Sequence, residues 1–225
     1  MKKMYLTLLV LGVCCGVRAE LAQEVLLNEG KLIAVIQTAE TSDNDKVTAC
    51  QNLGWCGTKA ATAPLAALLA NEKPVLRHAA RYGLEMIPDP AVEAVLCEAA
   101  GRLSGPALVG VLQSLGNLKQ TQSSRSWWSV LVGGSRYARP VALLSGRMGD
   151  SDKAVAAAAV QSLGKLATPE AMAALKTGLG KCPCVAVAYL NGAGKVAVSD
   201  QARAAAGYAD IRKTQENVES STRLA

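Results

Sequence analysis

The chain has 225 residues, enough for one domain with a sizeable core. Half of the residues are hydrophobic, yet only 4% are aromatic and none is Phe, so the core must be built mainly from Ala, Leu and Val. Alanine favours helices, whereas strands favour β-branched and aromatic residues, and this composition predicts packed helices. Lys and Arg are scattered along the chain, and the formal net charge of +6 becomes +3 without the three basic residues of positions 1–19, which is too mild to indicate nucleic acid, so no such partner is expected.

Residues 1–19 have the pattern of a secretory signal peptide. Two lysines form a positive start, an uncharged apolar run follows over residues 5–13, and Val17 and Ala19 are the small or aliphatic residues that a signal peptidase reads. The run is shorter than the roughly 20 apolar residues that a membrane-spanning helix needs. We therefore predict cleavage near Ala19 and an exported chain, periplasmic or secreted, with no membrane span after cleavage.

A short motif that ends in Leu-Gly repeats along the rest of the chain. The three closest copies are Gln51–Gly54, Gln113–Gly116 and Gln161–Gly164. Looser copies end at Gly83 and Gly194, and successive copies stand about thirty residues apart, except for one longer step before the third close copy. A unit of this length cannot bury its apolar face alone, so the units are expected to stack.

Each copy is predicted to close one helix and to lead into a second. Gly164 is expected to be the left-handed C-cap of a helix over 155–163, because glycine adopts that conformation without cost. Thr168 then stands where its hydroxyl can cap the next helix, over 170–179. Thr58 has the same spacing from the first copy, which predicts the same pair of helices there.

Turn residues mark further boundaries. Pro90 is expected to open a helix over 91–101, and Gly149–Asp152 is expected to form a turn and a cap before the following helix. Residues 213–225 form a polar C-terminal tail. The predicted repeat domain therefore extends over residues 20–212.

The longer step contains a predicted insertion at about residues 117–134, where a polar stretch precedes Trp127 and Trp128. Long connections between helices are often functional. Because Trp dominates the energetics of protein interfaces, Trp127 and Trp128 are candidate interface residues. The alternative is that the two side chains pack back onto the repeats and hold the insertion in place.

The repeated unit resembles the HEAT-type repeat: a helix that ends in Leu-Gly, a turn with Thr-Pro-Glu-Ala and a Leu-rich second helix. Residues 80–96 also resemble the HEAT-repeat proteins of exported bacterial chains. The resemblance covers roughly residues 31–212. It implies an all-α fold, a right-handed superhelical solenoid of stacked antiparallel helix pairs (HEAT/armadillo-like). It also implies a binding scaffold, and it carries over no functional residues.

Residues that could perform chemistry are few. The sequence lacks a P-loop, a Gly-x-Ser-x-Gly motif and a His-Glu-x-x-His motif. The single histidine, His78, is expected to make an interhelical hydrogen bond, and Arg81 and Glu85 are expected to form a surface pair because they are four residues apart. A bridge between Cys182 and Cys184 would span a single residue under strain, so we expect none.

Five cysteines remain after the predicted cleavage: Cys50, Cys56, Cys97, Cys182 and Cys184. None of them has the spacing of a zinc site, and Cys50 and Cys97 are expected to be buried as small hydrophobic side chains. No metal or cofactor is therefore expected.

The leading interpretation is a non-catalytic scaffold, an exported HEAT-repeat module that presents a helical surface to another protein. Two alternatives stay open. A helical-repeat lyase that handles a tetrapyrrole chromophore would need a cleft with a reactive Cys or His. A purely structural segment of a larger exported protein would need no binding face of its own.

Overall fold

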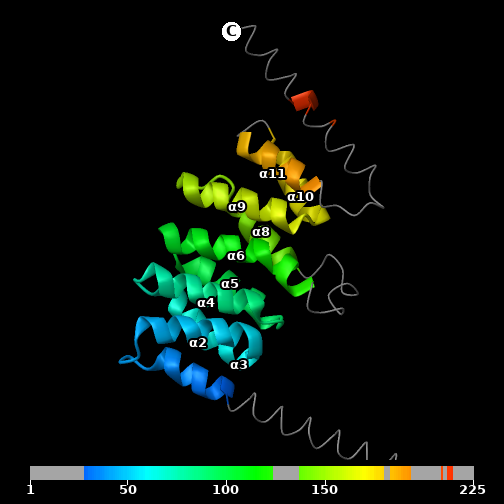
Figure 1. Ribbon diagram of the computed structural model, residues 1–225. Coiled ribbons are helices and arrows are strands. Elements are labelled where there is room, and N and C mark those ends of the chain that lie inside the picture. The colour runs from blue at the N-terminus through cyan, green and yellow to red at the C-terminus, as the bar shows by residue number, and fades with distance from the viewer. Residues whose placement is uncertain (1–27, 124–136, 180–182, 194–208, 210–211, 215–225) are drawn as a thin grey trace, which may run out of the picture.

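The computed structural model describes residues 28–123, 137–179, 183–193, 209 and 212–214 (Figure 1). Every regular element in these ranges is a helix, as the composition predicts. After a helix over 28–37, the helices alternate between two rows. The front row of Figure 1 consists of α2 (Asp43–Cys56), α4 (Pro74–Met86), α6 (Gly105–Ser123), α9 (Lys153–Leu166) and α11 (Pro183–Ala193). The rear row consists of α3 (Lys59–Ala67) with the short 3-10 helix η1 (Leu68–Ala70), α5 (Ala91–Arg102), α8 (Ala138–Arg147) and α10 (Pro169–Thr177).

Each front-row helix packs on the next front-row helix, and the rear-row helix that lies between them in the sequence connects the end of one to the start of the other. The leucines of both rows point into the layer between them. Fully buried examples are Leu53, Leu65, Leu84, Leu96, Leu115, Leu144 and Leu163. The predicted solenoid of antiparallel helix pairs is therefore confirmed.

The predicted N-caps are confirmed at the atomic level. Thr58 and Thr168 each accept a hydrogen bond from a backbone N–H in the first turn of α3 and α10, at 3.2 Å in both cases. Asp152 caps α9 in the same way at 2.8 Å, and Pro90 directly precedes α5. Each of these signals lies within one turn of the boundary that it sets, which is why the sequence alone locates them.

The predicted role of Gly164 is wrong. Gly164 lies inside α9, which continues to Leu166, and the left-handed cap is Ala167 with φ 45°. Gly54 and Gly116 likewise lie inside α2 and α6. The Leu-Gly motif therefore marks a position within each front-row helix and not the helix end.

These glycines allow close contact between front-row helices. A Cβ added at Gly164 would lie 2.6 Å from the carbonyl oxygen of Ala188 in α11, and one added at Gly116 would lie 2.7 Å from Cα of Ser162 in α9. Real Cβ atoms do not approach other atoms so closely, so alanine would separate the helices. By contrast, Gly101 in the rear-row helix α5 has nothing within 4 Å of the same position.

The insertion predicted at 117–134 begins differently from the expectation, because α6 continues through residues 117–123. The rest of the insertion, including Trp127 and Trp128, lies outside the described residues, as do the predicted signal peptide over 1–19 and most of the tail over 213–225. Across the part of the chain that the structure describes, no helix combines the length and the apolar character needed to cross a membrane.

Candidate functional site

On the outward surface of the front row, side chains from the same positions of the Leu-Gly motif recur from one helix to another. Its repeating side chains are Gln51, Gln113 and Gln161, three residues before the motif glycines, and Trp55, Asn117 and Lys165, directly after them. All six keep part of their surface in solvent. We call this surface, formed by α2, α4, α6, α9 and α11, the ladder face.

A chain of hydrogen bonds crosses three helices of the ladder face. The side-chain amide of Asn117 in α6 donates to a carboxylate oxygen of Glu85 in α4 at 3.0 Å. The amide oxygen of Asn117 accepts from Nζ of Lys165 in α9, also at 3.0 Å. These contacts connect three successive repeats and satisfy the carboxylate of Glu85 within the ladder face.

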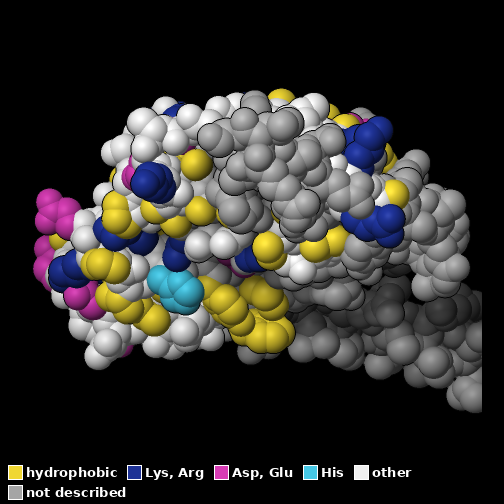
Figure 2. Space-filling view, turned by 90° about the horizontal axis from the view of Figure 1, so that it is seen from above, with side chains coloured by type: hydrophobic (Ala, Val, Ile, Leu, Met, Phe, Trp, Pro, Cys, Tyr) yellow, Lys and Arg dark blue, Asp and Glu magenta, His cyan; other side chains and the backbone are white. Residues whose placement is uncertain are grey.

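A groove separates α4 from α6 on this face. It is lined by His78, Arg81, Tyr82, Glu85, Gln113, Ser114 and Asn117. The imidazole of His78 is uncovered at the surface (Figure 2, cyan), and its Nδ1 lies 3.2 Å from Nη2 of Arg81. The expected interhelical hydrogen bond of His78 is therefore wrong, because its partner belongs to the same helix.

Arg81 is the unusual residue of the groove. The expected pair with Glu85 is wrong, since no ion pair joins these two described residues. The guanidinium instead packs against α6, where a Cβ at Gly110 would overlap Nη1, and its buried Nε has no hydrogen-bond partner. Burial lowers the pKa of Arg81, the charge of Glu85 acts in the opposite direction, and the charge of Arg77 lowers it further.

Large exposed apolar side chains also lie on the front-row helices. Trp55 of α2 is 65% exposed, Tyr82 of α4 is 38% exposed and Val187 of α11 is 58% exposed. Trp, Tyr and Arg are the residue types enriched at the centres of protein interfaces. The ladder face therefore combines interface-type side chains with the groove that contains Arg81.

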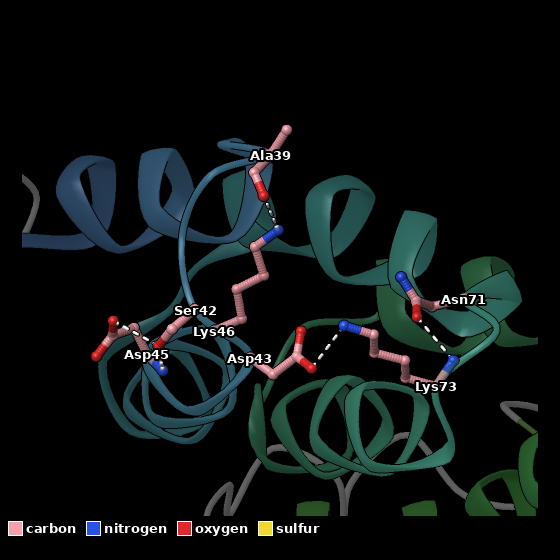
Figure 3. A network of polar contacts seen from close by, with 7 residues as sticks. All are labelled: Ala39, Ser42, Asp43, Asp45, Lys46, Asn71 and Lys73. Carbon is pink, nitrogen blue, oxygen red and sulfur yellow. Dashed lines mark hydrogen bonds and ion pairs between the residues drawn. The ribbon is translucent and has the colours of Figure 1, made fainter.

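The starts of α2 and α4 are joined by a separate polar network (Figure 3). Nζ of Lys73 lies 2.7 Å from a carboxylate oxygen of Asp43, and the Ser42 hydroxyl accepts from the backbone N–H of Asp45 at 3.2 Å. Both partners of the ion pair are well exposed, and exposed pairs contribute at most about 1 kcal/mol. This network fixes the starts of the two helices.

A buried carboxylate holds the first repeat together. Glu29 is 2% exposed and accepts hydrogen bonds from the backbone N–H of Thr58 at 2.7 Å and from its hydroxyl at 3.1 Å. Thr58 thus caps α3 and binds the helix over 28–37 at the same time. The contact is structural.

The thiols are poor nucleophiles. Cys50 and Cys97 are buried as expected, and burial raises the pKa of each thiol to about 11. Burial also raises the pKa of the half-buried Cys56. Cys184 is disulfide-bonded, and its partner lies outside the described residues because the other three described cysteines are free. Cys182 also lies outside them, so the absence of a bridge between Cys182 and Cys184 stays a prediction.

Within the described ranges, His, Cys, Asp and Glu side chains do not gather into a group of three that could hold a metal ion. No combination of groove residues there resembles a nucleophile with an adjacent base. The features that the geometry offers are a binding surface with aromatic and cationic side chains and a polar groove.

Stacked helix pairs with leucine-rich inner faces define this chain as an α-helical repeat protein. Residues 155–181 match the family described as PBS lyase HEAT-like repeat, and they cover most of α9 and all of α10. No curated protein matches the chain. The matched repeat and the stacked helices together show a HEAT-like helical repeat protein.

Sequence reasoning named Trp127 and Trp128 as the candidate interface, and both lie outside the described residues. It did not single out Trp55, although Trp55 directly follows the first Leu-Gly copy, in the position of Asn117 and Lys165. Comparing the residues that flank the repeated motif would have identified this position as outward-facing.

Proposed function

We propose that this helical repeat protein is a non-catalytic scaffold that binds another protein through its ladder face. The observation that carries the proposal is the 65% exposure of Trp55 on the helix next to the one that bears Tyr82 and Arg81. Leaving a large apolar side chain in water costs about 25 cal/mol per Å² of apolar surface, and a partner that covered Trp55 would recover that free energy. The proposal includes export, for which the pattern of residues 1–19 is the support.

The high pKa of the buried thiols supports a scaffold over a lyase-like enzyme that uses Cys50 or Cys97. That alternative draws on the name of the matched repeat family, and it would need a reactive Cys or His in a cleft. Cys50 and Cys97 have pKa values of about 11, so almost none of either thiol is the nucleophilic thiolate near neutral pH.

The proposal is tested by capturing partners from the native envelope fraction with the wild-type chain, with Trp55→Ala and with Arg102→Ala. Arg102 is the control because its side chain is 79% exposed on the rear-row helix α5. We expect Trp55→Ala to reduce recovery of the partner at least tenfold, a typical effect for an interface tryptophan. Its melting temperature should fall by only a few degrees, because most of the residue is exposed. Equal recovery with both variants would refute the assignment of the ladder face.

A further inference from the structure

We propose that the groove between α4 and α6 binds a carboxylate side chain of an acidic segment in the protein partner, with the guanidinium of Arg81 as its anchor. The inference rests on the proposed function and adds the chemistry of the partner. Three observations carry it: the surroundings of Arg81, the engagement of the neighbouring acid, and the polar lining of the groove.

The first observation is that Arg81 is a partly desolvated cation without a bonded carboxylate. Its Nε is buried and has no hydrogen-bond partner, and Nη1 packs against the backbone of α6 at Gly110. Among the described residues, its guanidinium makes a side-chain contact between Nη2 and Nδ1 of His78 at 3.2 Å, and no carboxylate lies within ion-pair distance. A buried charge is costly unless an opposite charge is paired with it, so a docked carboxylate would be strongly favoured here.

The second observation is that the acid nearest in sequence on this face is already engaged. Glu85 accepts from the side chain of Asn117, which in turn accepts from Lys165, each at 3.0 Å. Moving Glu85 to Arg81 would break this chain of hydrogen bonds across three helices. A carboxylate supplied by the partner could form a bidentate pair with Arg81 and leave these hydrogen bonds intact.

The third observation concerns access and selectivity. Arg81 keeps part of its surface exposed through the groove, and the exposed imidazole of His78 can rotate to admit a ligand. Gln113 and Tyr82 line the same groove and offer hydrogen bonds to an incoming carboxylate. Arg81 is the one Lys or Arg among the residues that line the groove, which suits one acidic side chain better than a phosphate backbone.

The test measures fluorescence anisotropy of a fluorescein-labelled peptide of alternating Glu and Gly, with the Gln-Gly peptide as its uncharged counterpart. We expect the full-length wild-type chain to bind the Glu peptide and not the Gln peptide. Arg81→Gln should raise the Kd about tenfold or more. Arg102→Gln also removes one positive charge, and it should change the Kd less than about twofold. Equal weakening by both variants, or equal binding of both peptides, would overturn the proposal.

A second pair of variants keeps the proposal testable if Arg81→Gln is unstable. Gln113→Glu places a carboxylate inside the groove, where it should pair with Arg81, raise the melting temperature by about 2–4 °C and weaken peptide binding about tenfold. Gln37→Glu makes the same charge change at an exposed position of the helix over 28–37, outside the ladder face, and should leave the Kd within about twofold. Equal effects of the two substitutions would show a long-range charge effect and overturn the assignment.

Inorganic phosphate at matched ionic strength is the competitor that distinguishes anion classes. Displacement of the Glu peptide by phosphate as readily as by unlabelled Glu peptide would overturn the carboxylate assignment. The partner-capture experiment separates this inference from the proposed function. Partner capture that is lost in Trp55→Ala but retained in Arg81→Gln would leave the ladder face as the binding surface and overturn the role of Arg81.

Discussion

Replacing Gly164 by alanine distinguishes close helix contact from helix capping as the reason for the Leu-Gly motif. An interior helical glycine normally costs stability relative to alanine, so the substitution would gain about 0.5–1 kcal/mol if nothing lay nearby. At Gly164, however, the new Cβ would lie 2.6 Å from the carbonyl oxygen of Ala188 and 3.2 Å from its Cα. The obstructing atoms are backbone, so α11 itself must move.

The two effects have opposite signs, and the magnitudes decide between them. Overpacking that forces a backbone shift costs about 1–3 kcal/mol. After subtraction of the helix-propensity gain, Gly164→Ala should lose about 1 kcal/mol, which lowers the melting temperature of a chain of this size by about 2–4 °C. Gly164→Val should lose more, because its larger side chain meets the same carbonyl.

The assay is thermal unfolding followed by the helical circular dichroism signal, with Gly101→Ala as the matched control. Gly101 lies in the rear-row helix α5, and a Cβ there would meet nothing within 4 Å. This control should gain up to about 0.5 kcal/mol. If Gly164→Ala stabilises the chain as much as Gly101→Ala does, the close-contact explanation is refuted.

Three further predictions follow from single contacts. Ala167→Gly should stabilise by about 0.5 kcal/mol in chemical denaturation, because φ 45° strains alanine but not glycine; a loss would contradict the left-handed cap. In the same assay, Thr58→Ala should lower the free energy of unfolding by about 2 kcal/mol and Thr168→Ala by about 1 kcal/mol. The difference is expected because, of the two threonines, only Thr58 also donates to the buried carboxylate of Glu29; equal losses would show that the Thr58–Glu29 contact contributes nothing. With iodoacetamide at pH 8, mass spectrometry should show Cys97, with its pKa of about 11, reacting more slowly than the less buried Cys56; earlier modification of Cys97 would contradict its burial.

The parts of the fold that the sequence could predict depend on interactions within one turn or on repetition. Thr58 and Thr168 are N-caps because their own hydroxyls reach the first turn. The repeated spacing of the Leu-Gly motif predicts stacking, since each unit leaves an apolar face uncovered. These signals need no knowledge of what lies across the helix.

The role of the motif glycine was beyond such reasoning. A glycine near the end of a helical pattern fits either a left-handed cap or a close helix contact, and the choice depends on the neighbouring helix. Here the backbone of Ala188 decides it, while Ala167 adopts the left-handed conformation despite its Cβ. A local preference was overridden by the contact between α9 and α11.

In the candidate site, too, the sequence predicts local contacts but not contacts between helices. Arg81 and Glu85 match a local ion pair by their spacing, but each side chain is drawn to a residue of α6, to Gly110 and Asn117 respectively. Those contacts join positions about thirty residues apart, so they become visible only when the repeats are superimposed on each other. The exposure of Trp55 likewise follows from its place in the stack.

Site-specific photo-crosslinking tests the central claim, that the ladder face is the surface that binds a protein partner. A photoreactive residue is placed at Gln51 or Gln161 on the ladder face, and at Ala63 or Glu98 on exposed positions of the rear row. The chain is then irradiated in the envelope fraction. The same crosslinked protein should appear from Gln51 and Gln161 and not from the rear-row positions. Crosslinks from Ala63 or Glu98 alone would contradict it.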